Sequence, residues 1–232
     1  MAINPSLILY HDNHLVIYNK QPGDIVQGDK TGDEPLSEQL KTYIKKKYNK
    51  PGEVYLGVVH RLDRPVSGVL ILARTSKALS RLNEMLKTGA VRKTYWAVVV
   101  NPPPWERNHL IHYLVRNEKQ NKSYAHDHPV GKSRKAELTY ELKAVSDHFY
   151  LLEINLLTGR HHQIRAQLSK VGCSIKGDLK YGAPRSNPDE SIHLHARSIE
   201  FIHPVRQTVI QVKADPPDDV LWNHFMNHER ES

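Results

Sequence analysis

The chain has 232 residues, 39% hydrophobic and 25% charged, which is the composition of a globular protein large enough to bury a core. Its net charge of +8, before counting 15 histidines, favours a polyanionic partner, nucleic acid first. The only cysteine, Cys173, excludes a disulfide framework and suits a reducing compartment. Neither a secretory signal nor an apolar run of membrane-spanning length is present, so we expect a cytoplasmic protein with no membrane partner.

Short apolar runs bounded by turn residues predict a protein with more strands than helices. The expected strands are residues 7–10, 14–18, 54–59, 69–73, 91–100, 138–145, 149–156, 193–201 and 208–213. The expected helices are residues 35–48, 76–88, 161–170 and 218–228. Because short turns join many of the strands, we expect an α+β fold with a mixed, mainly antiparallel central sheet and flanking helices.

Two helices carry specific signals at their ends or on their faces. Thr75 or Ser76 can cap the helix at 76–88, and Gly89 suits the left-handed residue that follows a helix. In the last helix we expect Val220, Leu221 and Phe225 to point inward.

Residues 105–134 interrupt this pattern. They are polar, basic and rich in histidine, with no clean period, and we expect an irregular excursion there. Neither a repeat nor a low-complexity linker divides the chain, so a single domain over residues 1–232 is expected.

The first candidate site is the segment 60–68, HRLDRPVSG, between two apolar runs. It presents one carboxylate, Asp63, close to His60 and flanked by Arg61 and Arg64. Positive neighbours favour the ionised carboxylate. On local pattern alone, an Asp that stabilises a turn while the two arginines face water explains the segment better, because turns are rich in Asp.

Two further segments combine cations with aromatic or polar groups. In the strand RKTYW at 92–96, Lys93 and Tyr95 share a face, an arrangement that suits a base stacked over a phosphate. A core Tyr or Trp beside edge lysines explains this segment equally well. The segment TGRHHQIR at 158–165 opens a helix with unusually polar residues, and Arg165 lies one turn beyond His161. Helix N-termini favour anions, so this helix start is better explained by function than by stability.

The histidines raise the question of a metal site. His126-Asp127-His128 and the pair His224/His228 have plausible ligand spacings. No cysteine cluster or His-Glu-x-x-His pattern accompanies them, so we expect neither a metal nor another cofactor.

Taken together, the motifs resemble those of the RluA-type pseudouridine synthases. HRLDRPVSG resembles their signature, and RKTY and TGRHHQIR resemble their second and third motifs. The segments IKGDLKYG at 175–182 and HLHA at 193–196, with His203-Pro204, resemble further blocks of the family. The match runs from about residue 7 to about residue 213 in the family's order.

The resemblance implies isomerisation of uridine to pseudouridine in structured RNA, tRNA or rRNA, with the target base flipped into the active cleft. It implies that Asp63 is the catalytic carboxylate, acting on the sugar or on the uracil ring, with Arg165 as its ion-pair partner and Tyr95 packed on the base. Leu194 would form the opposite wall of the pocket, and Arg61 would fill the vacated stack. The other expected substrate-binding residues are His60, Lys93, Arg160, His162 and Gln163.

The chain departs from the family pattern in three respects. Val66 stands where the family usually has Thr, and Gln167 where His is common. Residue 7 already matches the catalytic domain, so we expect no separate N-terminal RNA-binding domain. We expect a monomer. The alternative function is a non-catalytic RNA-binding or RNA-folding module that keeps the same fold.

Overall fold

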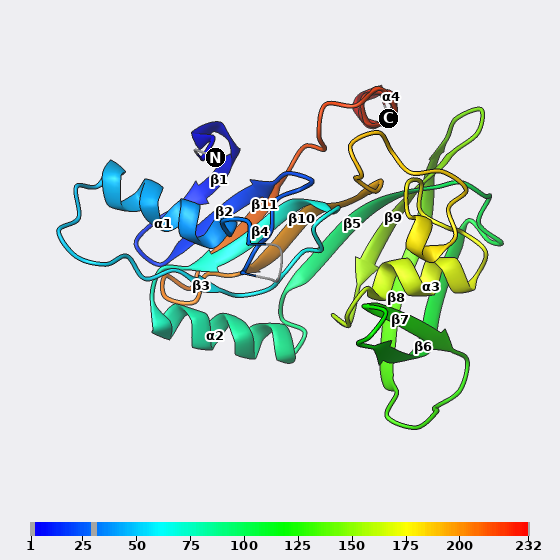
Figure 1. Cartoon of the computed structure of the whole chain (residues 1–232), viewed down its shortest axis with the longest axis horizontal. Coiled ribbons are helices and arrows are strands. Elements are labelled where there is room, and N and C mark those ends of the chain that lie inside the picture. The colour runs from blue at the N-terminus through cyan, green and yellow to red at the C-terminus, as the bar shows by residue number, and fades with distance from the viewer. Residues whose placement is uncertain (1–2, 29–31, 232) are drawn as a thin grey trace. The chain divides into compact units, whose positions relative to one another are not determined.

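The structure is a computed structural model that describes residues 3–28 and 32–231 (Figure 1). The chain forms two compact units, Met1–Val91 with Ala196–Asp215, and Arg92–His195 with Pro216–Ser232. No helix in the described part of the chain is long and apolar enough to cross a membrane.

The first unit is a sheet with one helix on each face (Figure 1). The strands are β1 (Ile8–His11), β2 (Leu15–Lys20), β4 (Ser67–Ala73), β10 (Leu194–Ile202, from Ala196 onward in this unit) and β11 (Val209–Lys213), in that order, with β3 (Gly57–Val58) beside β4. A short 3-10 turn, η1 (Pro5–Leu7), precedes β1. The helices are α1 (Leu36–Lys47) and α2 (Ser76–Lys87).

Residue alternation explains this layering. In the antiparallel pair β2–β4, Leu15 and Ile17 pack on the α2 side, whereas Val16 and Tyr18 pack on the α1 side. Both faces are covered, so β2 and β4 are buried along their whole length. The Thr75 side chain caps α2 by accepting the Ala78 N–H, as expected.

The second unit is an antiparallel sheet in the order β5-β9-β8-β6-β7. Its strands are β5 (Arg92–Val99), β6 (Arg107–Asn117), β7 (Lys122–His126), β8 (Arg134–Val145) and β9 (Tyr150–Leu156). The helical elements are α3 (Gln163–Lys170), the 3-10 turn η2 (Leu179–Tyr181) and α4 (Val220–Glu231). On one sheet face Trp96 and Val98 pack against α4, through Trp222 and Phe225.

The expected fold class, a mainly antiparallel sheet with flanking helices, is confirmed. The irregular excursion at 105–134 is wrong in its local structure, because β6 and β7 form a regular hairpin there. The sequence does not predict the hairpin because His112 is buried in β6 while its neighbour Ile111 is exposed. This inverts the usual alternation of buried apolar and exposed polar residues along a strand.

Two smaller expectations also fail. Only Gly57–Val58 of the expected strand 54–59 pairs as a strand. Val220, expected to point inward, is 87% exposed at the start of α4, whereas Phe225 is buried as expected, together with Trp222 and Met226. Pairing in the sheet and the true start of the helix decide these positions, and neither can be read from local hydrophobicity.

Candidate active site

The segment that carries Asp63 is a turn held from beneath by a buried lysine. Lys20, at the end of β2, is 0% exposed. Its Nζ donates to the carbonyl oxygens of Val66 at 2.7 Å, Gln21 at 3.0 Å and Arg64 at 3.1 Å. The Val66 N–H closes the turn by donating to the Asp63 carbonyl at 3.0 Å. The backbone from Asp63 to Val66 is therefore fixed.

Burial lowers the pKa of Lys20 to about 8, although the nearby carboxylates of Asp24 and Asp63 act to raise it. A buried ammonium is tolerated here because it meets three carbonyl oxygens. No sequence motif pointed to Lys20. Its only signal was a lysine at the end of a fully buried strand, just before Pro22-Gly23.

The other charged residues of the first motif lie in different surroundings. The His60 Nε2 accepts the Ile71 N–H of β4 at 3.2 Å, which ties the start of the motif to the sheet. Arg64 pairs with Asp33 at 2.9 Å, and its carbonyl also accepts the Gly23 N–H, so this arginine shapes the loop. Arg61 is exposed, and its entry into RNA stays a prediction.

Gly68 completes the motif because no other residue fits. Its φ is +114°, and a Cβ there would lie 2.4 Å from the Ala196 carbonyl oxygen of β10. The backbone of Ala196 is too close to residue 68 to leave space for any side chain there. The glycine lets β4 begin directly after the Asp63 turn.

The second and third motifs meet in the second unit. A Cβ built on Gly159 would lie 3.6 Å from the Lys93 Nζ, so this ammonium adjoins the Thr158–Gly159 turn. Burial lowers the pKa of Lys93. Strand register places Tyr95 opposite Ile154, on the sheet face that carries Ala136, which packs against Ala166 of α3. Tyr95 and the helix that bears Arg165 thus share one side of the sheet.

The start of α3 is built from the polar residues of the third motif. His162 adopts a left-handed conformation with φ +51°, and its Nδ1 hydrogen-bonds the Tyr181 hydroxyl at 2.9 Å. The Gln163 Oε1 accepts the Arg160 N–H at 3.0 Å and the Thr158 hydroxyl at 2.8 Å. Arg160 in turn donates through Nε to the Lys135 carbonyl. These bonds shape the turn, and direct RNA contacts by His162, Gln163 and Arg160 stay predictions.

Arg165 is buried on α3 and has a carboxylate partner within its own unit. Its Nε lies 2.7 Å from Asp178 Oδ2, and its Nη2 lies 2.8 Å from Asp178 Oδ1. Asp178 lies in one of the segments that resemble the family, IKGDLKYG, but the resemblance assigned it no role. The expected pairing of Arg165 with Asp63 stays a prediction.

The predicted site residues divide between the two units. The first unit carries His60, Arg61 and Asp63, and the second carries Lys93, Tyr95, Arg160, His162, Gln163, Arg165 and Leu194. Leu194 is buried at the start of β10. Among the described residues, no group of three or more histidine, cysteine, aspartate or glutamate side chains could hold a metal ion. Asp127, one of the ligand candidates, instead pairs with Lys170 at the end of α3.

Comparison with known proteins identifies the class to which this fold and these motifs belong. A family model described as RNA pseudouridylate synthase matches residues 14–170. The ribosomal large subunit pseudouridine synthase C of Buchnera aphidicola subsp. Baizongia pistaciae is 33% identical over 230 residues, which cover 96% of this chain and 70% of that protein. The ribosomal large subunit pseudouridine synthase D of Zymomonas mobilis is 28% identical, with 93% and 71% covered.

A solved structure supports the fold. Human RNA Pseudouridylate Synthase Domain Containing 4 matches with a TM-score of 0.78 at 24% identity, covering 96% of this chain and 92% of that one. The chain belongs to the RNA pseudouridylate synthase family. It is an enzyme that isomerises uridine to pseudouridine in RNA.

Proposed function

We propose that this enzyme modifies uridines of ribosomal RNA and that Asp63 is its catalytic carboxylate. The observation that carries the role of Asp63 is the turn held by Lys20, which fixes the backbone around a single carboxylate in the family's signature motif. Support for ribosomal RNA comes from the relatives, several of which are named as synthases of the large ribosomal subunit. The net charge of +8 suits a structured polyanion.

The chemistry explains why one carboxylate is enough. The bond from uracil N1 to C1′ breaks, a bond from C5 to C1′ forms, the C5 proton leaves and N1 gains a proton. Glycoside hydrolases need a second carboxylate because they protonate a departing group and activate water. Here the base stays bound and is reused, so Asp63 assists departure of the uracil without a partner acid.

The remaining residues bind and orient the substrate in this proposal. Tyr95 packs on the flipped uracil and Leu194 lies on its other side. Arg165 holds the Asp63 carboxylate through charge-assisted hydrogen bonds. Exposed Arg61 fills the stack that the base leaves, which offsets part of the few kcal/mol that flipping costs. Lys93 and Arg160 contact phosphates.

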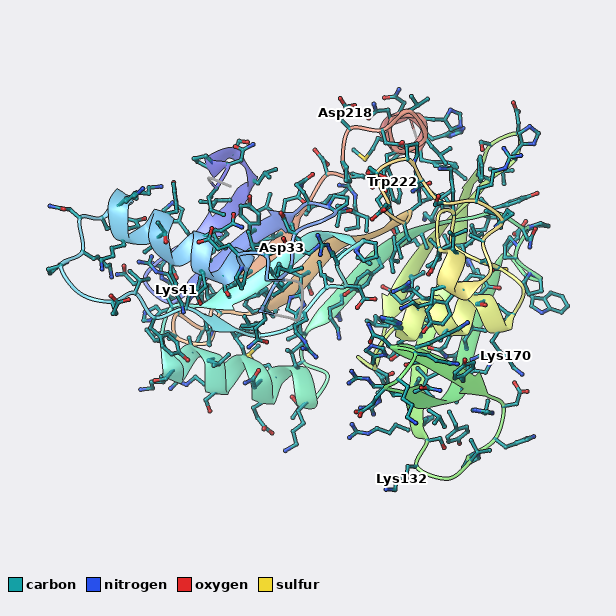
Figure 2. The ribbon with its side chains drawn as sticks, in the orientation of Figure 1. Asp33, Lys41, Lys132, Lys170, Asp218 and Trp222 are labelled. Atoms are coloured by element: carbon teal, nitrogen blue, oxygen red, sulfur yellow. The ribbon has the colours of Figure 1, made fainter. Side chains whose placement is uncertain are left out.

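The role of Asp63 is tested by Asp63→Ala, assayed for pseudouridine formation on ribosomal RNA that lacks the modification. We expect turnover to fall at least about 10³-fold, as for loss of a catalytic nucleophile or its base. Asp218→Asn is the matched control, because Asp218 is an exposed aspartate outside the motifs (Figure 2). Wild-type turnover by Asp63→Ala would rule out this assignment.

The substrate is tested by mapping pseudouridines in cells with and without the gene. We expect sites in large-subunit ribosomal RNA to disappear in the deletion strain and to return with the wild-type gene, but not with Asp63→Ala. Loss of transfer RNA sites alone would contradict the ribosomal assignment while leaving the chemistry intact. Binding of RNA with no site lost anywhere would favour the non-catalytic module.

A further inference from the structure

Two residues of the segment 175–182 hold the guanidinium of Arg165: Asp178 contacts one edge of it and Tyr181 covers one face. Asp178 is 1% exposed and Arg165 is 6% exposed, so both charges are withdrawn from water. The two contacts, at 2.7 and 2.8 Å, form a bidentate pair that uses Nε and Nη2 of the guanidinium. A bidentate carboxylate fixes the plane of a guanidinium as well as its position.

Tyr181 restrains the same guanidinium from above. The Cζ of Arg165 lies 4.9 Å from the centre of the Tyr181 ring, within the range of a cation–π contact. The ring itself is anchored, because the Tyr181 hydroxyl accepts the Ser123 N–H at 2.8 Å and hydrogen-bonds His162 Nδ1 at 2.9 Å. The guanidinium of Arg165 is therefore held within its own plane by Asp178 and on one face by the Tyr181 ring.

The backbone that presents Asp178 is also fixed. The Asp178 carbonyl accepts the N–H groups of Tyr181 and Ala183, each at 3.0 Å. Gly177, just before it, has φ +89°, and a Cβ there would lie 2.7 Å from the Ser191 carbonyl oxygen. A carboxylate on such a turn can orient another side chain without moving itself.

Stability alone does not explain this arrangement. A buried ion pair recovers its desolvation cost only with good geometry, and apolar side chains of similar volume stabilise a core as well or better. A bidentate carboxylate, unlike an apolar neighbour, also holds the guanidinium in one orientation.

We infer that Asp178 is a positioning residue for the isomerisation: by engaging Nε and Nη2 of Arg165, it fixes the plane and position in which this guanidinium acts. The inference rests on the proposed roles of Asp63 and Arg165. Asp178 itself touches neither RNA nor the reacting atoms in this proposal. Tyr181 contributes to the same orientation of Arg165 because its ring packs against one face of the guanidinium.

The test is Asp178→Asn, which keeps the size of the side chain but replaces one carboxylate oxygen and removes the charge. We expect kcat on ribosomal RNA to fall about 10- to 100-fold, the scale of a small misplacement in an active site, while KM changes less than about threefold. Asp127→Asn is the matched control, because Asp127, just beyond β7, pairs with Lys170 at the C-terminal end of α3, away from Arg165. It should keep wild-type kcat.

A double-mutant comparison separates positioning from folding. In an Arg165→Lys background, Asp178→Asn should lower kcat by much less than in the wild type, because the geometry it protects is already lost. Unchanged kcat for folded Asp178→Asn, or an equal further loss in both backgrounds, would overturn the inference. If Asp178→Asn does not fold, Asp178→Glu keeps the charge but shifts the carboxylate, and unchanged kcat would again overturn it. Wild-type kcat in Arg165→Lys and Asp63→Ala would instead refute the proposed function.

Discussion

The Nζ of Lys20 lies 2.7 Å from the Val66 carbonyl oxygen, three residues beyond Asp63. A buried cation thus supports the turn that carries the proposed catalytic carboxylate, and it also reaches the Arg64 carbonyl. The ammonium contributes hydrogen bonds and a fixed positive charge at once.

Replacing Lys20 should therefore affect catalysis. In Lys20→Met, three carbonyl oxygens lose a charged donor and the turn loosens, so we expect kcat to fall about 10-fold or more. The free energy of unfolding should change by about 1–3 kcal/mol, because the unpaired carbonyls cost energy while burial of the charge is relieved. Single-turnover assays and urea unfolding measure the two effects, and wild-type kcat in Lys20→Met would contradict the supporting role.

The same lysine predicts a pH dependence of the wild-type enzyme. Burial lowers the pKa of Lys20 to about 8, so kcat should decline as pH rises through about 8. The ordinary pKa of a lysine is 10.5. Between pH 8 and pH 10.5 the Lys20 side chain therefore binds more protons in the unfolded chain than in the folded one, so its contribution to the free energy of unfolding increases as the pH rises. The decline in kcat is then no sign of unfolding, and Lys20→Met should lack the step near pH 8.

Gly68→Ala should disable the first motif. The positive φ and the overlap with the Ala196 backbone together predict a loss of about 3 kcal/mol or more in the free energy of unfolding. Gly52→Ala is the matched control, because a Cβ there meets nothing within 4 Å, and it should change stability by less than about 1 kcal/mol. Equal stability of the two variants would show that the turn can relax around a side chain.

His193 should make the second unit sensitive to acid. Its Nε2 lies 3.0 Å from Asp219, and its ring stacks on Trp222 of α4 (Figure 2). Burial, helped by Lys176, lowers the pKa of His193 below its usual 6.5. As pH falls below about 6.5 the unfolded chain takes up the proton first, so stability declines. Urea unfolding at pH 7.5 and 5.5 should show a smaller decline for His193→Gln, and an unchanged decline would exclude this histidine as a cause.

Gln167 should contribute to stability through its amide. The Nε2 lies 3.2 Å from the carbonyl oxygens of Leu110 and Ala136 and 3.1 Å from His112 Nδ1, all of them buried. Gln167→Leu removes the amide N–H donor, and the three buried acceptors lose a hydrogen bond. We therefore expect the free energy of unfolding to fall by about 1–3 kcal/mol. Gln39→Leu on α1, where the amide bonds only an exposed carbonyl, should cost less than about 1 kcal/mol.

Much of the fold could be predicted because local signals and tertiary packing agree. The capped helix at Thr75 and the apolar run at Val69–Ala73 appear in the structure almost as expected. The hairpin β6–β7 could not be predicted, since its stability comes from pairing with β8 and from a histidine placed inside. The periodicity of apolar residues predicts which positions are buried only when the buried residues are apolar. The burial of a polar residue such as His112 therefore cannot be predicted from it.

The candidate site was predictable residue by residue, but the supporting contacts were not. Motif resemblance pointed to Asp63, Tyr95 and Arg165, although their roles stay predictions. The partners Lys20 and Asp178 act over 46 and 13 positions of sequence through hydrogen bonds that no local pattern encodes. Such long-range pairs depend on how strands and turns meet in space.

The contact between Gly68 and Ala196 has a consequence for synthesis on the ribosome. The first unit is discontinuous, since its sheet needs β10 and β11, which the ribosome makes more than a hundred residues after β4. A nascent chain that has released only residues up to Val91 lacks the strand beside the proposed catalytic turn. The turn around Asp63 can reach its final form only once Ala196 has left the exit tunnel, so a nascent chain that has not yet released β10 is expected to be inactive.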